Sequence, residues 1–247
     1  MGRYVCDSPI LAIMTIRDFQ ALTFDCYGTL IDWETGLLNS LRPWAARHGV
    51  RVSDERLLEI FAEAEAHLEG ELPRVRYSDI LRSVHARIAQ ALNVPVTTAE
   101  AEAFAQSVGD WPPFPDTVAA LQDLKQRHRL VIISNVDRAA FARTNAILGV
   151  AFDAIVTAED VGAYKPDPRM FERALSVLAD MGIRRDRTLH VAQSLYHDHV
   201  PAKALGLATV WVDRRHDRPG WGATAPPGAP IKPDLVVNSL AELAAHP

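Results

Sequence analysis

Cysteine is scarce in this chain of 247 residues, which has only Cys6 and Cys26. Two cysteines are too few for the disulfide framework that stabilises small secreted domains. Cys26 also lies next to the acidic residue Asp25. We therefore expect a protein of a reducing compartment, the cytoplasm.

Long apolar runs and strongly charged segments are also missing. The apolar run at 10–14 is much shorter than the roughly 20 apolar residues that span a bilayer, and it is too weak for a secretory signal. We expect residues 1–17 to be an N-terminal extension and expect no membrane partner. The 26 basic and 31 acidic residues give a formal charge of -5 with no long run of either sign, so we expect no nucleic acid partner.

What is present is an ordinary globular composition, with 48% hydrophobic and 23% charged residues. Helical patterns alternate with short apolar runs that are rich in β-branched residues, as in an α/β fold with a doubly wound, Rossmann-like parallel sheet. Ligands of such sheets bind beyond the carboxyl ends of the strands. The predicted strands are 21–24, 130–133, 154–157, 188–191 and 209–212.

A helical segment interrupts this alternation. Residues 35–111 contain four amphipathic helical patterns and no convincing strand, which predicts an inserted α-helical cap domain. The core domain then comprises 18–34 and 112–247. The proline-rich run at 111–115 predicts a stiff return linker. The stretch 219–230 and the preceding Arg214, Arg215 and Arg218 are expected to form a solvated loop.

The first strand ends in Asp25, which is followed by Gly28 and Thr29 in the run Phe24-Asp25-Cys26-Tyr27-Gly28-Thr29-Leu30. The glycine permits a tight turn at the sheet edge. This run resembles the nucleophile motif of the haloacid dehalogenase superfamily, and its Asp-x-Tyr-Gly-Thr-Leu pattern is similar to the type II (S)-2-haloacid dehalogenases. The resemblance makes Asp25 the expected nucleophile.

Three further motifs follow in the order typical of that superfamily. Ser134 and Asn135 end the second core strand and are expected to bind the anionic group of the substrate. Lys165 resembles the lysine that keeps the nucleophile ionised by Coulomb attraction. The run from Gln193 and Ser194 to Asp198 resembles the fourth motif.

Two positions depart from the superfamily's phosphatases. Tyr27 stands where those enzymes carry a second aspartate as acid and base, and tyrosine, with a pKa of about 10, is a poor proton shuttle. Gln193 replaces an acid that helps to hold magnesium, which prefers carboxylate oxygens. We therefore predict no metal and no cofactor; magnesium would be needed only by a phosphatase acting on a small phosphorylated metabolite.

Halide leaves without protonation, so the leading prediction is hydrolysis of a small 2-haloalkanoic acid through an aspartyl ester to give a 2-hydroxy acid. The expected catalytic residues are Asp25, Thr29, Lys165 and Asp198. Tyr27 and Thr29 are expected to orient Asp25. A non-catalytic protein that binds small anions is the third alternative. The predicted substrate-binding residues are Cys26, Tyr27, Ser134, Asn135, Gln193 and Ser194, with packing as the alternative role of Cys26.

One feature of the type II dehalogenases is missing. They carry an arginine on an early cap helix that receives the departing halide, but the matching helix, 55–69, has no arginine in its middle. Arg42, Arg74 and Arg76 are candidates to replace it, with surface ion pairing as the alternative. The resemblance also implies a possible homodimer.

Overall fold

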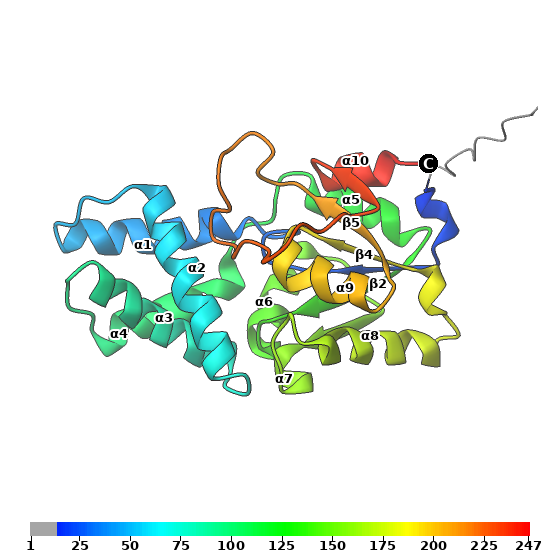
Figure 1. The fold of residues 1–247 in the computed structure, drawn as a ribbon. Helices are drawn as coiled ribbons and strands as arrows, with labels where there is room; N and C mark the ends of the chain where they lie inside the picture. The colour runs from blue at the N-terminus through cyan, green and yellow to red at the C-terminus, as the bar shows by residue number, and fades with distance from the viewer. Residues whose placement is uncertain (1–13) are drawn as a thin grey trace, which may run out of the picture.

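The computed structural model describes residues 14–247, so the predicted extension falls mostly outside it. At its edge, Ile16 is fully buried and begins the short 3-10 helix η1, Ile16–Asp18. The fold is a six-stranded parallel sheet in the order β3-β2-β1-β4-β5-β6 (Figure 1). The strands are β1 (Ala21–Phe24), β2 (Arg129–Ser134), β3 (Ala154–Thr157), β4 (Thr188–Ala192), β5 (Ala208–Val212) and β6 (Leu235–Val237).

Helices cover both faces of this sheet, as the alternating pattern predicted. The helices α5 and α10 pack together on one face, and α8 and α9 lie on the other (Figure 1). The core helices are α5 (Thr117–Lys125), α6 (Arg138–Leu148), α7 (Ala158–Val161), α8 (Pro168–Asp180), α9 (Val200–Ala204) and α10 (Leu240–Ala245). No helix within residues 14–247 is long and apolar enough to cross a membrane.

The inserted segment between β1 and α5 forms a separate helical layer beside the sheet (Figure 1). It begins slightly earlier than predicted, because Asp32 caps α1 and the helix starts at Trp33. Asp32 N–H donates to Pro112 O, so the two ends of the insertion meet. Its helices are α1 (Trp33–Arg47), α2 (Asp54–Glu71), α3 (Tyr77–Ala91) and α4 (Thr98–Ser107), followed by the 3-10 turn η2 (Val108–Asp110).

The strand order explains where the site forms. The central strand β1 pairs with β2 on one side and β4 on the other, with Phe24 opposite both Ile132 and Val191. The chain leaves β1, β2 and β4 at the same sheet edge, which is the switch point where α/β sheets bind ligands. Residues that are far apart in sequence therefore converge just beyond Phe24.

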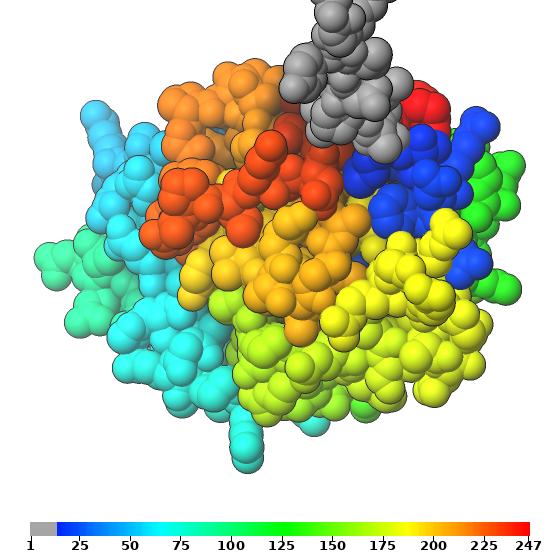
Figure 2. Space-filling model, turned by 45° about the vertical axis from the view of Figure 1, so that its right-hand side comes forward, coloured from blue at the N-terminus to red at the C-terminus, as the bar shows by residue number. Residues whose placement is uncertain are grey.

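The segment between β5 and β6 corrects one prediction. The side chains of Arg214 and Arg215 are only 7% and 9% exposed, so they are not solvated, and only Arg218 of the three is mostly exposed. Arg215 donates to Glu34 on α1 and to Glu55 on α2, which ties this loop to the cap. In Figure 2 the loop, in orange, lies against the cap, in cyan. Its composition signals only a turn-rich loop and carries no signal of this docking.

Candidate active site

The Asp25 loop is organised by backbone and side-chain hydrogen bonds. The carbonyl of Cys26 accepts the N–H groups of Thr29, Leu30 and Ile31, which closes a tight turn. Gly28 has φ +95°, a conformation that side chains disfavour, and a Cβ there would lie 3.1 Å from Trp33. Thr29 Oγ1 donates to Asp25 Oδ2 at 2.6 Å. The turn thus aims a buried carboxylate past the end of β1.

Lys165 forms the charged centre of the site. Its Nζ lies 2.7 Å from Asp25 Oδ1 and 2.9 Å from Asp198 Oδ1, and it also donates to Ile133 O at 3.1 Å. Burial opposes its charge, but the two carboxylates outweigh that effect and raise the Lys165 pKa. The pKa of Asp25 is raised by burial, and by Asp198, against the opposing effect of Lys165.

Asp198 lies in a π-helical turn, Leu195–His199, where one extra residue widens the backbone spiral. Burial alone would raise its pKa, but Lys165 and His190 lower it, so Asp198 is ionised. His190 Nε2 lies 3.1 Å from Asp198 Oδ1. The other oxygen, Oδ2, is buried and has no hydrogen-bond partner among the described residues. It is an unused hydrogen-bond acceptor at the centre of the site.

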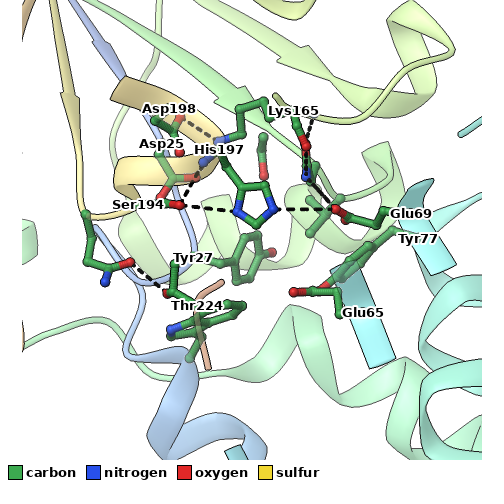
Figure 3. Close-up of a pocket in the computed structure, with 15 residues that line it drawn as sticks. Asp25, Tyr27, Glu65, Glu69, Tyr77, Lys165, Ser194, His197, Asp198 and Thr224 are labelled. Carbon is green, nitrogen blue, oxygen red and sulfur yellow. Dashed lines mark hydrogen bonds and ion pairs between the residues drawn. The ribbon is translucent and has the colours of Figure 1, made fainter. Parts of the chain in front are cut away.

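A cavity of about 40 Å³ lies between this centre and the cap. Side chains from both domains line it, as Figure 3 shows. A space of this size admits a ligand of only a few heavy atoms. The lining residues that were not predicted are Trp33, Glu65, Glu69, Tyr77, Val136, His197 and Thr224.

The cap contributes two buried carboxyl groups to the cavity. Glu65 and Glu69 lie one turn apart on α2 and are 4% and 6% exposed. Tyr77 O–H donates to Glu65 Oε1, and Asn135 Nδ2 lies 3.2 and 3.1 Å from the two oxygens of Glu69. Burial raises the pKa of Glu65 to about 7, and burial together with Glu65 raises the pKa of Glu69 well above its usual range.

Several predicted substrate-binding residues do line the cavity. Ser134 Oγ is buried there with no hydrogen-bond partner in the described chain. Asn135 also lines it, but its side chain is occupied by Glu69 and by Lys165 N–H. Gln193 and Ser194 line it too; Gln193 Oε1 accepts from Thr224, and Ser194 Oγ bonds His197.

Two predicted roles receive no support from the contacts observed. Cys26 is fully buried and is not among the residues that line the cavity, which favours packing as its role. The Tyr27 ring lines the cavity, but its hydroxyl bonds Thr144 Oγ1 at 2.7 Å rather than Asp25. Thr29 donates a hydrogen bond to Asp25 but does not line the cavity.

The candidate arginines lie away from the cavity. Arg42 pairs with Asp54 and Arg76 with Glu159, as expected for surface arginines, and Arg74 is exposed. None of the three lines the cavity, where Lys165 is the one lysine or arginine from residues 14–247. The cap therefore presents carboxyl groups where the dehalogenase resemblance calls for an arginine.

The residues present do not fit a magnesium ion. Lys165 Nζ already bridges Asp25 and Asp198, the two carboxylates that would hold the cation. The third position is Gln193, whose side-chain oxygen is engaged by Thr224. Across residues 14–247, no group of three or more His, Cys, Asp and Glu side chains is arranged to bind a metal.

Comparison with known proteins agrees with this fold. The family model of haloacid dehalogenase-like hydrolases matches residues 19–206, and the chain belongs to this family. It shares a fold with the L-2-haloacid dehalogenase from Xanthobacter autotrophicus, at a TM-score of 0.74 and 19% identity, with 92% of this chain and 97% of that chain covered. At this identity the likeness concerns the fold alone.

Curated relatives include dehalogenases and phosphatases. The chain is 33% identical over 134 residues to the (S)-2-haloacid dehalogenase of Pseudomonas fluorescens (53% of this chain, 54% of the relative). It is 35% identical over 104 residues to the glyceraldehyde 3-phosphate phosphatase of Methanothermobacter thermautotrophicus (41% and 45%). It therefore spans about half the length of these two relatives. Identity to (S)-2-haloacid dehalogenase 4A of Burkholderia cepacia is 26% over 245 residues (92% and 94%).

The residues that the motifs missed come mainly from the cap. Glu65 and Glu69 interrupt the buried face of α2, which otherwise carries apolar residues such as Phe61 and Leu68. Two acids four residues apart on the apolar face of a helix could have indicated site residues from the sequence, because carboxylates are rarely buried without a partner or a function. Thr224 had no such signal, since its loop reaches the cavity only through tertiary contacts.

Proposed function

We propose that this hydrolase displaces halide from a small 2-haloalkanoic acid through an ester on Asp25 and releases a 2-hydroxy acid. The observation that supports this best is the Lys165 bridge between Asp25 and Asp198 beside a cavity of about 40 Å³. The bridge supplies positive charge to the nucleophile without a metal. The cavity suits a substrate of few atoms.

In the first step an Asp25 carboxylate oxygen attacks C2 of the substrate with inversion, and halide leaves with the electron pair of the carbon–halogen bond. This step needs no acid, which agrees with Tyr27 standing where a phosphatase carries its acid and with its hydroxyl bound to Thr144. Ser134 Oγ, buried and unpartnered in the described chain, is available to the substrate carboxylate.

In the second step water adds to the carboxyl carbon of the Asp25 ester, and the 2-hydroxy acid leaves with one former Asp25 oxygen. One proton is released for each turnover. Asp198 Oδ2 is free to accept a hydrogen bond from the attacking water, while Lys165 holds the other oxygen of Asp198. The oxygen of the water thus remains on Asp25.

The test measures halide release from chloroacetate and from each enantiomer of 2-chloropropionate, beside hydrolysis of an aryl phosphate, with EDTA and with added magnesium. Halide release that survives EDTA is expected, and Asp25→Asn should abolish it. Asp18→Asn, at an exposed position outside the site, is the matched control. A single turnover in ¹⁸O-water should place the label on Asp25 rather than in the product.

Other outcomes identify the alternatives. Phosphate release that requires magnesium would replace this proposal with a phosphatase, the activity of one curated relative. Small-anion binding without any product would indicate a non-catalytic binding protein. Full activity of Asp25→Asn, checked by mass spectrometry for reversion to aspartate, would remove Asp25 as the nucleophile.

A further inference from the structure

The charge balance of the cavity does not match an anionic substrate if all of its acids are ionised. In the described part of the chain, four carboxyl groups line it, Asp25, Asp198, Glu65 and Glu69, and Lys165 is the one lysine or arginine that does so. Lys165 is already committed to Asp25 and Asp198. An incoming carboxylate, or a departing halide, would then face the cap acids with no cation to offset them.

Glu65 is placed to contact the ligand. Tyr77 O–H occupies its Oε1, and Figure 3 shows the carboxyl group directed into the cavity from the cap side. Ser134 lines the same cavity and is 1% exposed, and its buried Oγ has no hydrogen-bond partner in the described chain. The cavity thus offers unfilled polar positions on both the cap and core sides.

We infer that Glu65 binds the substrate as an undissociated carboxylic acid, whose O–H donates to the anionic part of the ligand where an arginine would otherwise be needed. The inference rests on the proposed function and names the group that receives the anion. A neutral carboxyl can donate a hydrogen bond without adding negative charge to the site. The anionic part is either the substrate carboxylate or the halide, and the experiment separates them.

The surroundings of Glu65 favour its neutral form. Burial raises its pKa to about 7, Asp25 adds to this effect, and the Tyr77 hydrogen bond opposes it. The pKa of Glu69 on the next turn is also raised well above its usual range, by burial and by Glu65. His197, whose pKa burial lowers to about 4, adds no positive charge. The ionisable groups that line the cavity together with Glu65 are Asp25, Tyr27, Glu69, Tyr77, Lys165, His197 and Asp198.

The experiment measures binding of propionate, an unreactive substrate analogue, and of chloride at constant ionic strength, by calorimetry from pH 5.5 to 9. Only protonated Glu65 donates, so the wild-type affinity should fall about tenfold per pH unit above pH 7, to roughly 1% of its plateau at pH 9. Whichever anion shows this fall is the one that Glu65 contacts.

Variants make the assignment specific to Glu65. Glu65→Gln retains a donor that does not titrate, so its affinity should stay within about threefold from pH 6 to 9. Tyr77→Phe removes a donor that stabilises the ionised carboxyl, so the fall should move to higher pH. Glu63→Gln, on the same helix and 72% exposed, is the matched control and should keep the wild-type profile.

The results separate this inference from the proposed function. A flat wild-type profile for both anions, or a fall that persists in Glu65→Gln, would overturn the inference while leaving halide release intact. Tighter binding of ethylammonium at pH 9 than at pH 6, lost in Glu65→Gln, would also overturn it, because Glu65 would then bind a cation as a carboxylate. Absence of halide release with pH-dependent anion binding preserved would reject the proposed function alone.

Discussion

Replacing Lys165 with methionine tests the charged centre most directly. The substitution keeps a long, flexible side chain of similar length but removes the ammonium that lies 2.7 Å from Asp25 and 2.9 Å from Asp198. Two buried carboxylates would then face one another without a cation. Breaking a buried ion pair in this way typically costs about 3–5 kcal/mol.

The cost should depend on pH, because a proton can replace the missing ammonium. Without Lys165, the folded-state pKa of the carboxylate pair rises above its unfolded value of about 3.9. A group with a raised folded-state pKa stabilises the fold at pH values below its unfolded-state pKa. This contribution is lost as the pH rises through the folded-state pKa. The variant should therefore lose the full amount, about 3–5 kcal/mol, at pH 8 and clearly less at pH 5.

Urea denaturation at pH 5 and pH 8, with halide release at pH 7, measures both consequences. If the Asp25 pKa rises two units above the assay pH, about 1% remains ionised, so activity should fall at least about 100-fold. Lys203→Met breaks an ion pair with Asp234 whose side chains are 28% and 37% exposed; it should keep activity and lose no more than about 1 kcal/mol. Equal destabilisation of the Lys165 variant at both pH values, or activity within tenfold of wild type, would refute the reasoning.

The remaining predictions address other contacts of the site. Thr29→Ala removes the 2.6 Å hydrogen bond to the nucleophile and should lower kcat about 10- to 100-fold, since a hydrogen bond to a charged group contributes about 1.5–3 kcal/mol. Thr29→Ser keeps the hydroxyl and should restore most of the lost kcat. A full rate in the alanine variant would exclude this positioning role. Tyr27→Phe loses a hydroxyl that bonds Thr144 and not the nucleophile, so kcat should stay within a few fold of wild type. Chemical denaturation should show a loss of about 1 kcal/mol in the free energy of unfolding. A large drop in kcat would support the predicted role of Tyr27 in orienting Asp25. Arg215→Leu leaves Glu34 buried without its main partner and should lower the free energy of unfolding by about 3–5 kcal/mol. Arg218→Leu, at a side chain that is 62% exposed, should lower it by less than about 0.5 kcal/mol. Comparable losses for the two variants in calorimetric unfolding would contradict the buried ion pair between loop and cap.

The sheet was predictable because parallel strands buried on both faces appear in sequence as short apolar runs. The strands Ala21–Phe24 and Ala154–Thr157 coincide with the prediction, and the three other predicted strands differ from it by one residue at one or both ends. The strand Leu235–Val237 was missed, because it has three residues and is only partly buried. So short a segment has too few residues to show a periodicity.

The core half of the site was also predictable. Asp25, Ser134, Lys165 and Asp198 follow sheet strands or their connections, and strand order brings them to one edge. The resemblance to the haloacid dehalogenase superfamily, confirmed by the family match, supplied their order along the chain. The distances that join Lys165 to both carboxylates come only from the folded chain.

The sequence by itself determined the α/β core, the helical insertion and the four motifs, because each is written in local apolar periodicity or in residues close together in the chain. Only the tertiary structure decided that α2 brings Glu65 and Glu69 into the same cavity as Asp25, and that the loop carrying Thr224 lines this cavity. The angle at which a cap docks depends on packing between distant surfaces, such as the Arg215 contacts with Glu34 and Glu55. Local sequence patterns do not encode that angle, and so the cap half of the site emerged only on folding.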